Sequence, residues 1–260
     1  MRHYIIDLGD CFGSVWSDDR ISRRLNHAYL LDFPYMLEDF VTLGLIERPW
    51  ERARRGKLFG YFSAGDFEPE LWRGEYPNPA FVRMTEGDAA WMARILARFD
   101  EGLVRSAVAI GKYDEENERF LAETLIARRM AILRRYLSRL SPIGEVVATA
   151  KGLCGTDLAR LTGVVPNEPN SFRARAYRGA EHEPTRALRL VGEASPRVCV
   201  ELPHAAFSTN VAPDDARRYV IVDLENGYAR GPLRVHLYDL GPSLGYRLVG
   251  VERPDSASRP

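Results

Sequence analysis

The residues best suited to chemistry lie near the start of the chain, where Asp7 and Asp10 are interleaved with Gly9 and Gly13. The apolar run 4–6, directly before Asp7, favours a buried strand. A carboxylate at a strand end, followed by glycines that let the backbone turn sharply, suits a metal or phosphate site. An ordinary turn explains the same residues, because Asp and Gly are favoured there. We predict Asp7 and Asp10 as metal ligands, and Gly9 and Gly13 as turn or phosphate-binding residues.

Three classes of enzyme place an aspartate after an N-terminal strand. Phosphatases of the haloacid dehalogenase type need a second aspartate two residues on, where this chain has Gly9. Actin-like sugar and acid kinases use Asp-x-Gly, but Asp10 replaces their usual threonine or serine, and no second phosphate-binding glycine loop follows. In protein-kinase-like folds the strand delivers Asp-Phe-Gly, whose aspartate holds Mg²⁺ against the nucleotide phosphates. Residues 7–9 fit this third pattern, with leucine in place of phenylalanine.

The kinase interpretation lacks its upstream parts in this chain. A kinase of this plan needs a nucleotide-binding lysine, a catalytic aspartate and a metal-binding asparagine, all before the metal aspartate. Only six residues precede Asp7. We therefore expect a partial kinase-like protein with no catalytic residue of its own and no activity alone. Mg²⁺ is the expected cofactor. ATP is expected only if a lobe encoded upstream completes the site, and that lobe is the expected partner.

Composition sets limits on partners and location. The chain has 36 basic and 36 acidic residues and a formal net charge of +0, so we expect neither nucleic acid nor an anionic membrane as a partner. The basic cluster within 128–135 is interpreted as a solvated helix face. No apolar run approaches the roughly 18 residues of a membrane span. Asp7 and Asp10 interrupt the N-terminal apolar run, so no signal peptide is predicted and a cytoplasmic location is the default.

The other metal-binding and nucleophilic residue types are scattered along the chain. Cys11, Cys154 and Cys199 are far apart and odd in number, which predicts neither a zinc site nor a disulfide framework and favours a reducing compartment. The histidines show no metal-ligand spacing, so we interpret them as structural or solvent-facing. They are His3, His27, His182, His204 and His236.

Helical periodicity dominates the first half of the chain after the opening strand. A helix is expected between Pro34, which suits a first turn, and Gly44, which suits an end. Thr85 is a good N-cap with an aspartate three residues on, close to a capping box, and it opens the first of three further helices. The last of them should run from a cap at Asp114 to the Ser-Pro pair 141–142.

The pattern changes to short alternating runs toward the C-terminus. A linker with one short helix is expected at 144–167, and six strands beyond it. The predicted strands are 172–177, 186–191, 197–202, 218–224, 233–238 and 246–251. The predicted fold class is therefore α+β. Residues 1–143 should form an N-terminal strand-turn with a mostly helical, kinase-like C-terminal lobe, 168–254 a small antiparallel β-sandwich, and 255–260 a disordered tail.

A non-catalytic role is the alternative to a partial kinase. In this interpretation the protein is an interaction module whose β-sandwich binds a partner, and the turn after Asp7 is structural. Aromatic residues on the C-terminal sheet could bind a sugar or a peptide, although packing in the core explains them as well.

Four segments of the chain resemble blocks of one family of large, uncharacterised bacterial proteins. The segment HYIIDLGDCFGS of this chain resembles the family's HYLIDFGSTLG-type motif. Three later segments of this chain resemble successive blocks of the same proteins: FVTLGLIERPWE, FEPELWRGEYPNPAFVRMTEGDAAWMARIL and FLAETLIARRMAILRRY. That family resembles remote protein or lipid kinases. The resemblance implies that this chain is the C-terminal half of such a protein, with Asp7 in the place of the metal-binding aspartate. Asp10 stands where the family has a small residue, and it adds charge beside the implied metal.

Overall fold

The computed structural model describes most of the chain. The described residues are 23–24, 27–52, 58–74, 76–168, 171–178, 183–184, 188–192, 196–205, 212 and 215–255. The chain divides into two compact units. Unit 1 comprises Met1–Met84 and Phe99–Ile132, and unit 2 comprises Thr85–Arg98 and Leu133–Pro260. The strand predicted at residues 4–6 lies outside the described residues.

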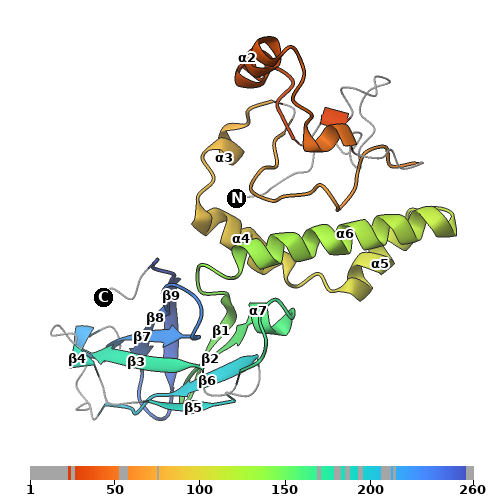
Figure 1. Ribbon diagram of the computed structural model, residues 1–260. Coiled ribbons are helices and arrows are strands. Elements are labelled where there is room, and N and C mark those ends of the chain that lie inside the picture. The colour runs from red at the N-terminus through yellow and green to blue at the C-terminus, as the bar shows by residue number, and fades with distance from the viewer. Residues whose placement is uncertain are drawn as a thin grey trace. The chain divides into compact units, whose positions relative to one another are not determined.

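Unit 1 is built from helices and loops. Its described elements are α2 (Phe33–Thr42), the short 3-10 helix η1 (Pro49–Arg52), α3 (Pro79–Val82), α5 (Glu101–Ala109) and the first part of α6 (Glu115–Tyr136), as Figure 1 shows. Helix α2 forms where the sequence predicts it. The Asp32 side chain accepts a hydrogen bond from the Tyr35 backbone N–H at 3.3 Å, and a proline occupies the first turn. Leu43 (φ 52°) and Gly44 (φ 70°) then leave the helix through left-handed backbone.

A small hydrophobic core joins α5 and α6 within unit 1. Phe59, Val108, Leu121 and Ala122 are buried together in it. Helix α6 begins after Asp114, as predicted, because the Asp114 side chain accepts a hydrogen bond at 3.0 Å from the backbone N–H three residues on. This core fixes the part of α6 that faces the loops of unit 1.

Unit 2 combines helix α4 (Glu86–Leu96) and the end of α6 with two sheets. Thr85 and Asp88 form a complete capping box at the start of α4, which confirms the predicted cap. Arg135 on α6 donates two charge-assisted hydrogen bonds to Glu86 at 2.8 and 3.0 Å. These contacts hold α4 against the end of α6.

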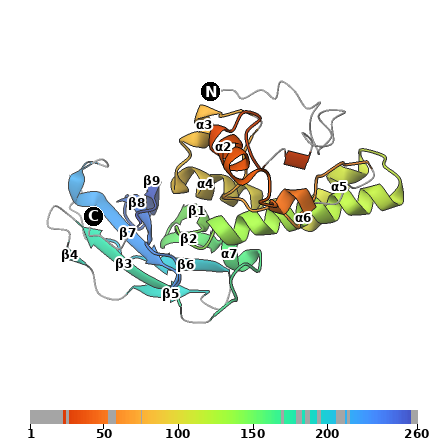
Figure 2. The ribbon, with the colours of Figure 1, turned by 45° about the horizontal axis from the view of Figure 1, so that its top comes forward.

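The sheets are antiparallel and have the strand orders β1-β2-β6-β5 and β4-β3-β7-β8-β9 (Figures 1 and 2). The first sheet contains β1 (Ile143–Thr149), β2 (Gly152–Asp157), β5 (Arg189–Val191) and β6 (Arg197–Glu201). The second contains β3 (Arg173–Arg178), β4 (Glu183–Pro184), β7 (Tyr219–Glu225), β8 (Leu233–Asp239) and β9 (Tyr246–Glu252). The short helix α7 (Leu158–Leu161) follows β2 directly.

One hydrophobic core is shared by the two sheets. Ile143, Leu153, Val198 and Val200 from the first sheet belong to the same buried cluster as side chains of β3, β7, β8 and β9. Along β7 every second residue belongs to this cluster, namely Val220, Val222 and Leu224, each of which is 0% exposed. This period of two is the signal that predicted the strands, and each of the six predicted runs overlaps an observed strand.

The predicted fold class is wrong. The C-terminal region is made mostly of strands, which form two antiparallel sheets that begin at Ile143. The prediction was instead a helical, kinase-like lobe followed by a linker and a small sandwich. Residues 144–167, assigned to a linker with one short helix, contain β1 and β2 as well as α7. Glycines interrupt the alternation of polar and apolar residues there, so the sequence pattern does not indicate these strands. Gly152 (φ 146°) is required by packing, because a Cβ on it would lie 2.1 Å from the Val200 carbonyl oxygen.

The cysteine spacing predicted no disulfide framework, but the structure pairs two of the three cysteines. Cys154 on β2 and Cys199 on β6 lie directly opposite each other in register and form a disulfide. They are 45 residues apart in the sequence, so only the pairing of the two strands brings them together. The predicted reducing compartment loses its support, because disulfides persist mainly in oxidising environments.

Candidate functional site

A cavity in unit 1 brings aromatic and charged side chains together from distant parts of the chain. Its volume is about 270 Å³. Its aromatic lining residues are Trp50, Tyr61, Phe67 and Trp72, and its ionisable lining residues include His27, Asp66, Glu68, Arg73 and Arg128. Arg128 comes from α6, and most of the others come from the loop 58–74. Aromatic walls with a few polar groups are typical of sites for small molecules.

Ring contacts hold the two tryptophans of the cavity in place. His27 stacks on Trp50 with 5.3 Å between ring centroids and 19° between the planes. Tyr35 of α2 contacts Trp50 at 5.9 Å. Trp72 meets Phe81 edge-on at 5.1 Å. Offset and edge-to-face contacts are the preferred geometries of aromatic rings. Two indole rings with defined positions therefore line the cavity.

Arg128 brings a half-buried positive charge to the cavity. Its guanidinium lies over Phe62 at 3.9 Å and over Phe67 at 4.6 Å, and its Nε–H donates to the Ser63 carbonyl oxygen at 2.6 Å. Burial lowers the pKa of Arg128 to about 10. Its terminal NH groups make no hydrogen bond or ion pair with any residue that the structure describes. Arg128 therefore lines the cavity with terminal donors that no described residue uses.

His27 and Asp66 add hydrogen-bonding groups of other kinds. Burial lowers the pKa of His27, and this effect outweighs the nearby Asp66 carboxylate, which acts to raise it; the Arg128 charge lowers it further. The imidazole is therefore neutral at pH 7, with one donor and one acceptor. The exposed Asp66 offers acceptors only. Within the described part of the chain, neither side chain has a hydrogen-bond or ion-pair partner.

The cavity combines hydrogen-bonding groups with apolar aromatic side chains. Ser63, His27 and Asp66 share the cavity, but no hydrogen bond among the described residues joins them in the way that an activated nucleophile requires. Across the described ranges, no three His, Cys, Asp or Glu side chains lie together as a metal-binding group. The cavity instead offers donors, acceptors and flat apolar surfaces to one small molecule.

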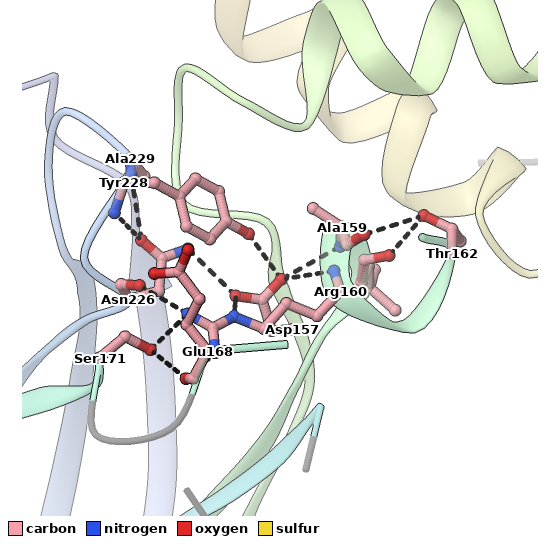
Figure 3. A network of polar contacts seen from close by, with 10 residues as sticks. Asp157, Ala159, Arg160, Thr162, Glu168, Ser171, Asn226, Tyr228 and Ala229 are labelled. Atoms are coloured by element: carbon pink, nitrogen blue, oxygen red, sulfur yellow. Dashed lines mark hydrogen bonds and ion pairs between the residues drawn. The ribbon is translucent and has the colours of Figure 1, made fainter. Parts of the chain in front are cut away.

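Unit 2 contains a polar network around the buried Asp157, which Figure 3 shows. Asp157 caps α7 by accepting hydrogen bonds from the backbone N–H groups of Ala159 and Arg160 at 3.1 and 3.2 Å. It also accepts from the Tyr228 hydroxyl at 2.7 Å and from the Asn226 side-chain amide at 3.2 Å. Burial, together with the Asp157 charge, raises the pKa of Tyr228, so the phenol remains a donor.

Arg160 balances the charge of Asp157 in this network. Its Nε lies 3.5 Å from the Asp157 carboxylate, and its terminal NH groups donate to the carbonyl oxygens of Glu168 at 2.9 Å and Asn226 at 3.0 Å and to the Ser171 hydroxyl. Figure 3 shows that the partners of Asp157 and Arg160 come from separate segments of the chain. Because the network satisfies its own charges and acceptors, we interpret it as structural.

Asp239 at the end of β8 is a second saturated carboxylate of unit 2. One of its oxygens lies 2.6 Å from His204 Nδ1 and accepts from the Gly241 N–H at 3.0 Å. The other accepts from Arg178 and from the Ala205 N–H, both at 3.0 Å. Burial alone would raise the pKa of Asp239, but these hydrogen bonds outweigh burial and lower the pKa. This site also has no free acceptor to offer a ligand.

The predicted metal site lies outside the described residues. Asp7, Gly9, Asp10 and Gly13 all fall within residues 1–22. The structure therefore does not bring them together or separate them, and Mg²⁺ and the conditional ATP stay predictions.

Sequence reasoning missed the cavity. It interpreted His27 as structural or solvent-facing and Arg128 as part of a solvated face, whereas both are half-buried and line the cavity. The available signal was the loop 58–74, which carries several aromatic residues and no helix or strand periodicity. Aromatic side chains in a loop need partners to pack against, and here they surround a cavity.

Comparison with known proteins gives no relative from which a function could be transferred. No protein-family model, no curated protein and no solved structure matches the chain. Each helix in the described part of the chain is too short or too polar to span a lipid bilayer. The cavity of unit 1 is therefore the basis for a proposal about function.

Proposed function

We propose that unit 1 binds a small, uncharged ligand of the saccharide class in its cavity, without chemical conversion. One observation carries the proposal. The side chains of His27, Asp66 and Arg128 have polar atoms without partners among the described residues, and they line the same cavity as Trp50 and Trp72. Polar groups that converge on an aromatic cavity are the usual pattern of a ligand site.

The charges of the lining favour a ligand without net charge. Asp66 and Glu68 are opposed by Arg73 and Arg128, and His27 is neutral at pH 7. A strongly anionic ligand would meet two carboxylates, and a cationic ligand would meet two guanidinium groups. A neutral molecule with several hydroxyl groups can instead accept from Arg128 and donate to Asp66.

The shape of the lining favours a single sugar ring. The C–H face of a pyranose is flat and apolar and packs well on an indole, which Trp50 and Trp72 supply. Adjacent hydroxyl groups on the rim of the ring suit a guanidinium or a carboxylate. The volume of about 270 Å³ is near the lower end of the roughly 300–1,000 Å³ that is common for ligand sites. It suits one or two rings and is too small for a long lipid chain.

Tryptophan fluorescence tests the proposal, because two of the four tryptophans line the cavity. Neutral mono- and disaccharides should change the emission saturably, and Trp72→Ala and Arg128→Met should weaken binding at least about tenfold. Arg119→Met, an exposed arginine on the same helix, is the matched control and should bind as the wild type does. Saturable binding of nucleosides or amino acids with no response to any saccharide would contradict the proposed ligand class.

The N-terminal motif favours a second proposal, in which this chain supplies the metal-binding half of a kinase-like phosphotransferase. Asp7 would hold Mg²⁺ with help from Asp10, and a lobe encoded upstream would supply the nucleotide site. Titration calorimetry with Mg²⁺ and ATP, with and without that lobe, tests it. Heat that Asp7→Ala removes would support this proposal, and no heat under either condition would end it.

A further inference from the structure

Helix α2 presents its apolar side to the outside. One face of the helix carries apolar residues at the i, i+3, i+4, i+7, i+8 spacing. We call them the α2 stripe: Phe33, Met36, Leu37, Phe40 and Val41. Every member is at least half exposed, up to 78% for Phe40. An apolar stripe of this kind normally packs against a core, so its exposure indicates an interaction surface.

The opposite side of α2 is anchored to unit 1, which fixes the stripe in its outward position. Tyr35 lies under the guanidinium groups of Arg24 at 4.6 Å and Arg48 at 4.8 Å. Arg48 also forms ion pairs with Glu38 and, at 3.7 Å, with Asp39. Turning the stripe inward would break these contacts. The polar side of the helix therefore contacts unit 1, and its apolar side is left exposed for a partner.

We propose that the α2 stripe is a dimer interface between two copies of this chain, with the two α2 helices antiparallel. The stripe reads nearly the same in both directions, because Phe33 and Phe40 lie at equal distances from the central pair Met36 and Leu37. A two-fold axis at that pair would place Phe33 of each chain against Phe40 of the other. Such self-complementarity is what a two-fold interface requires.

The available apolar area matches a dimer of ordinary size. Leu31, Leu43 and Leu45 lie just before and just after α2 in the sequence and are 77%, 85% and 84% exposed. With the five stripe residues they offer on the order of 800 Å² per chain, if each side chain buries about 100 Å². About 800 Å² per partner is the standard size of a stable protein interface.

Charge favours a second copy over a lipid surface. The only ionisable side chains on the polar side of α2 besides Tyr35 are Glu38 and Asp39, and both already pair with Arg48 of the same chain. Helices that lie on membranes usually carry lysine and arginine there, which anionic lipid attracts. The formal net charge of +0 also leaves little repulsion between two copies at neutral pH.

Sedimentation equilibrium of the full chain between about 1 and 100 µM tests the proposal, a range in which a micromolar dimer would dissociate. The wild type should approach twice the chain mass of 29.4 kDa. Leu37→Glu places like charges at the two-fold axis and should weaken dimerisation at least about a hundredfold, whereas Leu37→Ala should have a smaller effect. Leu244→Glu, at an exposed leucine of unit 2, is the matched control and should remain dimeric.

Three results would overturn the proposal. The first is a wild type that is monomeric throughout this range. The second is a dimer that persists in Leu37→Glu. The third is a monomeric wild type that binds vesicles of neutral phosphatidylcholine through the α2 stripe, which Leu37→Glu would abolish. Circular dichroism of each variant checks that the chain is folded. We expect each variant to fold, because all changed side chains are at least half exposed.

Discussion

The Asp157 network of unit 2 and the cavity of unit 1 contain similar residue types. They differ in how many hydrogen-bond partners these residues have. In unit 2, Asp157 and Arg160 form an ion pair, and both also make hydrogen bonds with backbone and side-chain groups around them. In unit 1, Asp66 and the terminal NH groups of Arg128 line an open volume without partners among the described residues. Satisfied polar residues stabilise the fold, and we propose that the polar residues left available in the cavity serve recognition.

The largest effect should come from breaking the satisfied network. Asp157→Ala leaves Arg160 as a buried charge without its counterion, and we expect it to lower the free energy of unfolding by about 3–5 kcal/mol. Urea denaturation measures this change. The control is Arg189→Ala, which removes an exposed ion pair with Glu201 and should cost less than about 1 kcal/mol. A loss below about 1 kcal/mol for Asp157→Ala would contradict a structural role.

The next effect concerns the disulfide, which also belongs to unit 2. Replacing Cys154 and Cys199 with serine should lower the free energy of unfolding by about 2–4 kcal/mol, because the unfolded chain is no longer constrained. Denaturation of the double variant, beside the wild type with and without reductant, measures the loss. Under non-reducing conditions the unfolded wild type should take up alkylating reagent at Cys11 alone. Alkylation of all three cysteines would contradict the disulfide.

Asp239 should give a smaller effect that depends on pH. Its folded pKa is lowered, so the ionised carboxylate stabilises the fold above the unfolded pKa of about 3.9, and this stabilisation is lost as the pH falls through the folded pKa. Asp239→Asn should therefore be less stable than the wild type at pH 7 but lose less stability between pH 7 and pH 3. Parallel pH dependences for the two proteins would show that the Asp239 hydrogen bonds do not favour the ionised form.

The smallest effect on stability should come from the cavity. Arg128→Met keeps an apolar stem against Phe62 and Phe67 and removes a partly desolvated charge. We expect the free energy of unfolding to change by less than about 1 kcal/mol or to rise. A rise is common when a residue that is kept for binding is replaced, because such residues are often not optimal for stability. A loss as large as that of Asp157→Ala would place Arg128 among the structural residues and remove the contrast between the two units.

Local signals in the sequence predicted individual elements but not how they assemble. The Thr85 and Asp114 caps and the alternation in β7 depend on residues close in the chain, so patterns of a few residues were sufficient. The fold class failed because glycines interrupt β1 and β2, and Gly152 is required by a backbone 48 residues away in the sequence, at Val200. Contacts of that range leave no local pattern.

The candidate site was missed for the same reason. Arg128 and His27 meet only after the chain has folded, and neither has a spacing that signals a shared cavity. The disulfide also depends on strand register and not on cysteine spacing. In contrast, the amphipathic pattern of α2 could be recognised in the sequence, but only the structure shows that its apolar side faces outward.

Nuclear magnetic resonance of the histidine rings during a titration with neutral saccharides tests the contrast between the two units in a single spectrum. His27 lines the cavity, and His204 lies in the saturated Asp239 site. We predict that a bound saccharide shifts the His27 signals saturably, leaves those of His204 in place, and that free His27 titrates below its ordinary pKa of 6.5. Saccharide binding that leaves His27 unchanged, or a panel in which no saccharide moves it, would contradict the account.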